Sequence, residues 1–163
     1  MLVEATVEDP LATDADTVVV GHFEDEPTPN LDGALGALVA SGEASPEFGR
    51  LAVTHSEGRR LILVGLGKRP AFGPEPARRA AATAQGRAAG LSAKVLCWSV
   101  PKDDPEVARA LVEGTLLRAY RFDRYKPADN GTAIERLILA SRADHAQLAH
   151  DTAAIVAAQN RAR

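Results

Sequence analysis

The chain has 163 residues, the size of one domain, and its 45% hydrophobic and 25% charged residues are ordinary for a globular protein. A net charge of −3 argues against a nucleic-acid-binding protein, whose affinity depends on a positive face. No apolar run approaches the roughly 20 residues of a membrane span, and the N-terminus lacks the pattern of a secretory signal. The single cysteine excludes an internal disulfide. We therefore expect a cytoplasmic protein with no membrane partner.

The first half of the chain has the patterns of strands and of one helix. Residues 2–8 alternate between apolar and polar, and residues 17–21 form a β-branched run typical of a strand that is buried on both faces. One helical face is predicted by the spacing of Leu31, Leu35, Leu38 and Val39, ending near residues 41–42. Two strands, residues 51–54 and 60–64, are predicted to form a hairpin around residues 56–58.

In the second half, helical patterns alternate with single strands. An alanine-rich helix is predicted over residues 77–89, ending at Gly90. The next helix begins after Asp103 or Asp104 and is expected to run to about Tyr120. The remaining predicted elements are strands at residues 94–100 and 134–141, a break at residues 127–132, and a final helix over about residues 144–163 that Asp144 caps.

Strands that alternate with helices, together with one hairpin, are typical of an α/β protein. We predict a three-layer αβα domain with a mixed β-sheet that comprises residues 1–163 as a single unit.

An aromatic and basic segment stands out because aromatic residues are only 4% of the chain. Its members lie between residues 113 and 126 and are Arg118, Tyr120, Arg121, Phe122, Arg124, Tyr125 and Lys126. Three interpretations remain open: bases stacked on the aromatic rings, a surface that packs against another domain or subunit, and an ordinary helix end with cations near its negative pole.

The stretch Gly65-Leu66-Gly67-Lys68 follows a predicted strand, where a phosphate-binding turn would lie. Pro70 occupies the position where the dinucleotide fingerprint needs its third glycine, and the Walker pattern also fails. A structural turn and an anion-binding turn made by Gly65, Gly67 and Lys68 both remain possible.

No residue pattern indicates chemistry in this chain. The four histidines, His22, His55, His145 and His150, show no spacing that would bring metal ligands together. Cys97 lies in an apolar run with no cation beside it in the sequence, and Thr13-Asp14-Ala15-Asp16 has the composition of a turn before a strand. We assign no catalytic residue, no metal ligand and no cofactor to the chain.

Three segments resemble the N-terminal domain of the leucyl aminopeptidases, the cytosol aminopeptidase family or peptidase family M17. They are residues 61–68, residues 113–126 and the final Asn160-Arg161-Ala162-Arg163, and the resemblance covers roughly residues 50 to 163. It implies a macro-domain-like fold, with the seven residues from Arg118 to Lys126 named above packing against another domain or subunit.

The resemblance also implies a parent enzyme that removes N-terminal residues from peptides. Two divalent ions, zinc or manganese, would be held by a C-terminal catalytic domain that this chain lacks, and the parent would be a hexamer. The final helix would lead toward that domain, and the fragment alone would be an inactive part that serves assembly and access. The alternative is a macro-like module that binds a nucleotide or ADP-ribose, although the chain contains no Gly-Gly pair.

Overall fold

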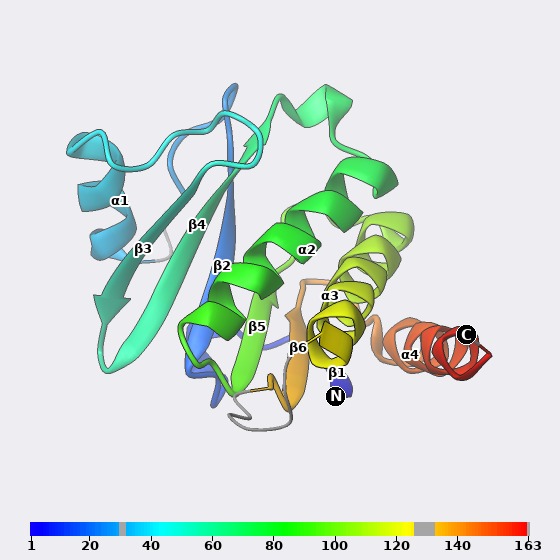
Figure 1. Cartoon of the computed structure of the whole chain (residues 1–163). Helices are drawn as coiled ribbons and strands as arrows, with labels where there is room; N and C mark the ends of the chain where they lie inside the picture. The colour runs from blue at the N-terminus through cyan, green and yellow to red at the C-terminus, as the bar shows by residue number, and fades with distance from the viewer. Residues whose placement is uncertain (30–31, 126–132, 163) are drawn as a thin grey trace.

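The protein is built around one six-stranded β-sheet with the strand order β1-β6-β5-β2-β4-β3 (Figure 1). The computed structural model describes residues 1–29, 32–125 and 133–162, with the backbone alone for residues 121–125. β3 runs antiparallel to β4, and the other neighbouring pairs are parallel. The predicted mixed sheet is confirmed, and its strands are β1 (Leu2–Thr6), β2 (Thr17–Phe23), β3 (Leu51–Ser56), β4 (Arg59–Gly67), β5 (Val95–Ser99) and β6 (Arg136–Ala140).

Helices cover both faces of the sheet and complete the three predicted layers. α2 (Pro74–Gly90) and α3 (Pro105–Tyr125) lie side by side across one face, and α4 (Ala146–Arg161) lies beside α3 at the β1 edge (Figure 1). The short helix α1 (Gly33–Ala40) packs on the opposite side next to β3. Among the described residues, no helix is long and apolar enough to cross a membrane.

The central strand β2 shows why the core has two halves. Val19 and Phe23 belong to the apolar cluster beneath α2 and α3, whereas Val18 and Val20 belong to the cluster on the α1 side. Successive side chains of a strand point to opposite faces, so a run of buried residues requires cover on both sides. The β-branched run in the sequence therefore marks a strand at the centre of the sheet, as predicted.

α2 and α3 are packed closely because small residues line their contact. A side chain at Gly114 of α3 would place its Cβ 2.1 Å from the carbonyl oxygen of Arg78 in α2. The same Arg78 donates from Nε and Nη2 to Glu113 Oε2, at 2.9 and 2.6 Å. Two consecutive residues of α3 thus hold one residue of α2, one by leaving space for its backbone and one by binding its guanidinium group.

The predicted turn at residues 65–67 is wrong, because β4 continues through Gly67. A loop at residues 45–50 crosses the end of this strand, and the amide of Gly65 donates to the carbonyl of Arg50 at 2.8 Å. A Cβ at Gly65 would lie 2.0 Å from the carbonyl oxygen of Glu47. Gly65 is therefore required by the close approach of this loop.

The end of α3 also differs from the prediction. The helix continues past Tyr120 to Tyr125, because the sequence contains no glycine or proline between Gly114 and Pro127. The predicted break at residues 127–132 lies outside the described residues.

We predict that Gly114→Ala lowers the free energy of unfolding by about 1–3 kcal/mol, although alanine is the better helix former. The reason is the clash with the Arg78 carbonyl, which only separation of α2 and α3 can relieve. Gly36→Ala is the matched control, because Gly36 lies in α1 with no atom within 4 Å of an added Cβ. Urea denaturation of both variants checks this, and equal stabilities would contradict it.

Candidate functional site

The structure brings no metal-binding cluster together in the part of the chain that it describes. No group of three or more histidine, cysteine, aspartate or glutamate side chains is placed to hold a metal ion there. His55 and His150 are exposed, His22 is buried in β2, and His145 Nε2 lies 3.3 Å from Asp103 Oδ1. Burial lowers the pKa of His22, which favours its neutral form. The described residues therefore offer no site for divalent ions, which the resemblance places in a separate catalytic domain.

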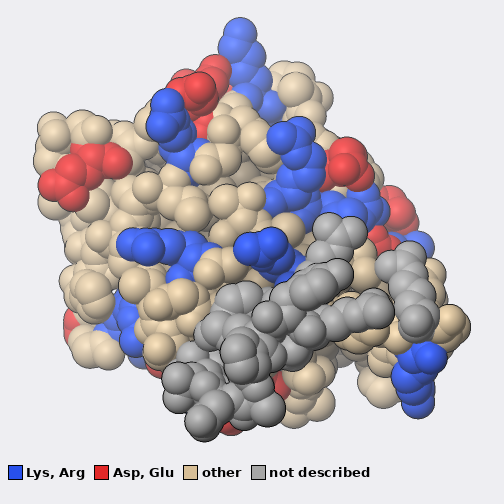
Figure 2. All heavy atoms as spheres, in the orientation of Figure 1, with Lys and Arg blue, Asp and Glu red and all other residues tan. Residues whose placement is uncertain are grey.

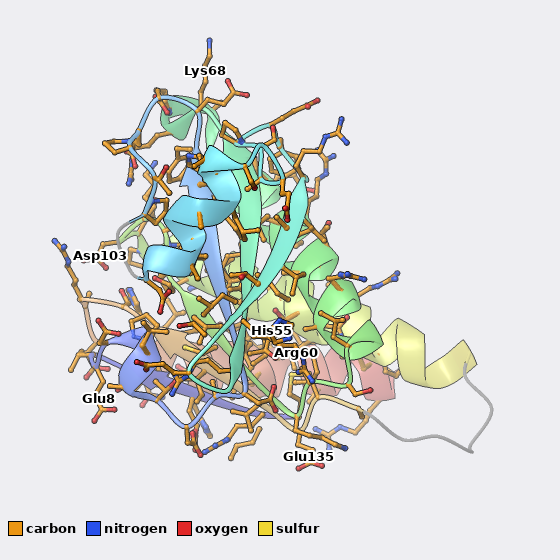
Figure 3. All side chains as sticks on the ribbon, turned by 90° about the vertical axis from the view of Figure 1, so that its left-hand side faces the viewer. Glu8, His55, Arg60, Lys68, Asp103 and Glu135 are labelled. Atoms are coloured by element: carbon orange, nitrogen blue, oxygen red, sulfur yellow. The ribbon has the colours of Figure 1, made fainter. Side chains whose placement is uncertain are left out.

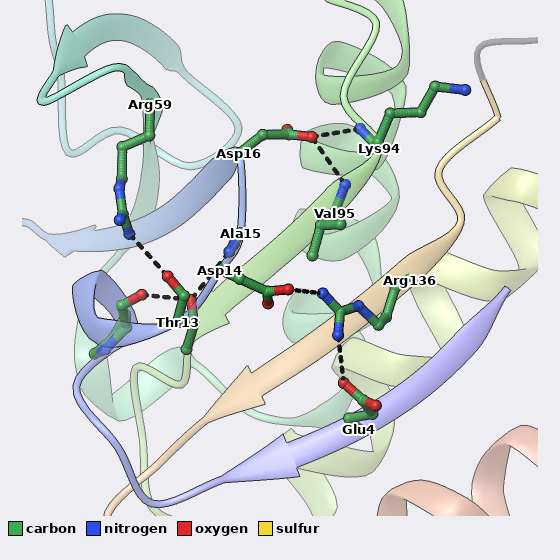
Figure 4. A network of polar contacts seen from close by, with 10 residues as sticks. Glu4, Thr13, Asp14, Ala15, Asp16, Arg59, Lys94, Val95 and Arg136 are labelled. Carbon is green, nitrogen blue, oxygen red and sulfur yellow. Dashed lines mark hydrogen bonds and ion pairs between the residues drawn. The ribbon is translucent and has the colours of Figure 1, made fainter.

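The carboxylates of the acidic turn before β2 bind residues of neighbouring strands (Figure 4). Asp16 Oδ2 accepts hydrogen bonds from the amides of Lys94 and Val95, at 2.8 and 3.0 Å. Asp14 pairs with the guanidinium group of Arg136, whose other contact is Glu4. That hydrogen bond and the positive charge lower the pKa of Asp14. Both carboxylates of this turn are engaged at the amino ends of strands, in agreement with the predicted turn.

The only cysteine is not placed as a nucleophile. Cys97 lies in β5 with none of its surface exposed, between the paired strands β2 and β6. Burial raises the pKa of its thiol to about 12, well above the range in which a thiolate forms at neutral pH. Cys97 is therefore a small buried residue of the core, as its position in an apolar run indicates.

A crevice of about 700 Å³ opens at the carboxyl ends of β1, β5 and β6. This is the edge at which open α/β sheets bind ligands. Six charged residues line it: Arg69, Lys102, Arg142, Glu8, Asp9 and Asp103. Glu8 and Asp103 project from the same side of the molecule (Figure 3).

The charges of this crevice do not favour a diphosphate. Arg69 is paired with Glu26 and donates to the carbonyl of Pro101 at 3.2 Å. Lys102 Nζ lies 3.3 Å from the carbonyl oxygen of Phe72. Two of the three cations are therefore held by the chain itself, while three carboxylates would repel an anionic ligand.

The glycines of the predicted anion-binding turn use their amides within the protein. Gly65 donates to Arg50, as described above, and Gly67 donates to the carbonyl of Pro46 at 2.9 Å. Lys68 points away from the body of the domain (Figure 3). Both glycines thus take part in the packing of the 45–50 loop, and the Lys68 side chain is separated from them.

The aromatic and basic segment lies at the end of α3. Arg118 is exposed and its guanidinium group lies over Gly86 of α2, 3.3 Å from the position of an added Cβ, while Tyr120 is half-buried. On the face formed by α2 and α3, the Lys and Arg side chains form separate groups divided by uncharged residues (Figure 2). The side chains of Arg121, Phe122, Arg124 and Tyr125, and Lys126 as a whole, lie outside the described residues.

Sequence reasoning missed a cavity of about 270 Å³ that is lined by α2, α3 and α4. Gln85 and Asn160 line it, and each carries a buried amide oxygen without a hydrogen-bond partner. The signal available in the sequence was Gln85 itself, a polar residue within the alanine face of α2. That alanine face predicts close packing, so a glutamine within it indicates a polar interior contact.

We predict that Cys97 does not react with 5,5′-dithiobis(2-nitrobenzoate) at pH 8 in the folded protein. Its thiol is buried and its pKa is raised to about 12, so neither access nor a thiolate is provided. Urea should expose one reactive thiol per chain, since the sequence contains one cysteine. Rapid labelling without denaturant would show that β5 is accessible.

Because the pKa of the Cys97 thiol is raised in the folded protein, the free energy of unfolding should fall as the pH rises above about 9 toward 12.

Comparison with known proteins identifies the relatives of this chain. Residues 19–128 match the model of the cytosol aminopeptidase family, N-terminal domain. A probable cytosol aminopeptidase of Roseiflexus castenholzii is 36% identical over 86% of this chain and 30% of its own length. One from Geobacter sp. strain M21 is 34% identical over 79% of this chain and 29% of its own length. The chain thus spans about 30% of the length of the curated relatives that it matches.

Solved structures show the same fold. A mutant of tomato leucine aminopeptidase superposes with a TM-score of 0.79 at 17% identity, covering 99% of this chain and 36% of that protein. A Trypanosoma brucei macrodomain in complex with ADP superposes with a TM-score of 0.68 at 10% identity, covering 93% of this chain and 69% of that protein. The predicted macro-domain-like architecture is confirmed, and by its sequence match the chain belongs to the N-terminal domain family of the cytosol aminopeptidases.

Proposed function

We propose that this chain is the non-catalytic N-terminal domain of a leucyl aminopeptidase that removes N-terminal residues from peptides. The observation that carries the proposal is the family match over residues 19–128 in a chain that spans about 30% of its relatives. The remaining part of such an enzyme would contain the catalytic domain. We place the complete enzyme in the cytoplasm.

The reaction of the complete enzyme would use two divalent ions, zinc or manganese, which polarise the scissile carbonyl and activate water. The residues described here offer no cluster that could hold such ions. Cys97 is buried and the carboxylates of Asp14 and Asp16 are engaged with other strands, so these three side chains are not available as a nucleophile or a general base. The contribution of this domain is therefore assembly and the shaping of access to the catalytic domain.

The end of α3 is the surface that we assign to assembly. Its last turns project beyond the body of the domain (Figure 3), so the other described residues do not surround them. The residues assigned to this packing surface are Arg118, Tyr120, Arg121, Phe122, Arg124, Tyr125 and Lys126. Aromatic and arginine side chains are enriched at protein interfaces, where they contribute most of the binding energy.

The expected partners of this surface are the catalytic domain of the same chain and neighbouring subunits in a hexamer. α4 ends near the amino ends of the strands, as α3 does, because both helices run back from the carboxyl ends of the strands. A polypeptide that follows α4 would begin near the packing surface. This arrangement supports packing of the catalytic domain against the end of α3.

We predict that the purified chain does not hydrolyse leucine p-nitroanilide above the buffer rate, with either Mn²⁺ or Zn²⁺ present. The reason is that its described residues provide no metal cluster. The positive control is a complete cytosol aminopeptidase under identical conditions. Turnover that co-purifies with the chain and depends on metal would refute the assignment as a non-catalytic domain.

In the complete aminopeptidase, Phe122→Ser should weaken subunit or domain association by at least about tenfold, as loss of an aromatic anchor does at interfaces. Sedimentation velocity over a concentration series measures this effect. Val7→Ser is the matched control, because Val7 is 63% exposed and follows β1 at the opposite end of the sheet. If both variants assemble like the unmodified enzyme, the end of α3 is not the packing surface.

A further inference from the structure

The cavity among α2, α3 and α4 has a size and an opening that suit a small molecule. Its volume of about 270 Å³ lies just below the range of drug-sized ligand pockets, and it is partly open to the surface. Most of its wall is apolar and comes from Leu116 and Ala119 of α3, Val156 and Ala157 of α4, and Ile134 before β6. These side chains would surround the hydrocarbon part of a small molecule.

Two buried polar atoms without a hydrogen-bond partner belong to residues of this wall. Gln85 is only 2% exposed, and its Oε1 has no hydrogen-bond partner in the described structure. The Oδ1 atom of Asn160 is also buried without a partner. A buried acceptor that has lost its water and gained no donor is unfavourable, and most such groups in proteins are satisfied. Both atoms belong to residues that line the same cavity, so one occupant with N–H donors could satisfy them together.

The lining also determines the charge of that occupant. No acidic or basic side chain is among the described residues that line the cavity, which also include Met1 with its amino group. A charged ligand would find no oppositely charged side chain there and would lose its hydration. A neutral donor carries no such penalty, and a carboxamide is especially suitable. Its amino group donates while its oxygen accepts, so it matches the Gln85 side chain in either orientation of that amide.

We propose that this cavity binds a small, neutral ligand in which a branched apolar group carries an amide. The apolar group lies against Leu116, Ile134 and Val156, and the amide donates to Gln85 Oε1 and Asn160 Oδ1. This is the chemistry of a peptide group beside an aliphatic side chain. The inference does not depend on the proposed aminopeptidase function, since it rests on the cavity of this chain alone.

The probe is isobutyramide, which has the apolar group and the amide in a molecule small enough for the cavity. Its matched control is 3-methyl-2-butanone, which has nearly the same shape and keeps the carbonyl but replaces the amino group with a methyl group. Titration of the ¹⁵N-labelled chain, followed by ¹H–¹⁵N correlation spectra, reports on the side-chain amides of Gln85 and Asn160 directly. We expect a dissociation constant on the order of a millimolar for the amide and roughly fivefold to tenfold weaker binding of the ketone.

Two variants assign the effect to the cavity. Gln85→Met keeps the length of the side chain and removes the acceptor, and Asn160→Leu removes the second acceptor at the half-buried end of α4. Each should abolish most of the preference for the amide over the ketone. Gln159→Leu is the control, because Gln159 is exposed on the same helix and does not line the cavity. If Gln85→Met does not fold, as judged by circular dichroism, Asn160→Leu still decides the test.

The result that supports the proposal is selective shifting of the Gln85 and Asn160 side-chain resonances by isobutyramide in the unmodified chain and in the control. In each cavity variant the remaining side-chain amide should shift equally weakly with isobutyramide and with the ketone. Equal binding of amide and ketone would overturn it, since the cavity would then be a purely apolar site. Absence of any shift at tens of millimolar ligand would also overturn it, because bound water would then satisfy the two oxygens.

Discussion

The arrangement of the sheet depends on one carboxylate, that of Asp16. It accepts hydrogen bonds from the amides of Lys94 and Val95 at the start of β5 and from the Thr17 hydroxyl at the start of β2, and it lies 3.6 Å from Arg60 at the start of β4. Three neighbouring parallel strands thus begin at one side chain. A slip of one residue would move every side chain to the wrong face, so a fixed start determines the whole register. Of these three strands, β5 reaches the crevice with its other end, so the contact at Asp16 also fixes the register of one strand that lines the crevice.

The sequence predicted the elements well where a local pattern and the tertiary contacts agree. The three valines at residues 18–20 are all buried because β2 is covered on both faces, and all six predicted strands are present. Prediction failed where a distant segment decides the local structure. Gly65 and Gly67 have the composition of a turn, yet the 45–50 loop pairs with them and extends β4. No local pattern reveals that loop.

The candidate sites show the same division. The histidines and cysteine of the sequence have no spacing typical of a metal or catalytic site, so no such residue is assigned. The structure shows what Asp14 and Asp16 do instead: their carboxylates bind residues of neighbouring strands. The cavity could not be predicted in this way. Gln85 and Asn160 are 75 positions apart in the numbering and come together only because α2 and α4 both contact α3. A site formed between helices leaves only part of its signature on each of them, here the glutamine within the alanine face of α2.

The alanine face of α2 has a consequence for how this domain can vary. Its buried residues include Ala77, Ala80, Ala81, Ala84, Ala88 and Ala89, none of which loses rotamer freedom on folding. Such residues offer almost nothing to truncate, so the usual damage from shortening a core side chain does not arise there. Harm comes from enlargement, which would separate α2 from its neighbours. This helix should therefore tolerate smaller residues at these positions better than larger ones. A larger residue at any of them would need a smaller one opposite it in α3 or in the sheet.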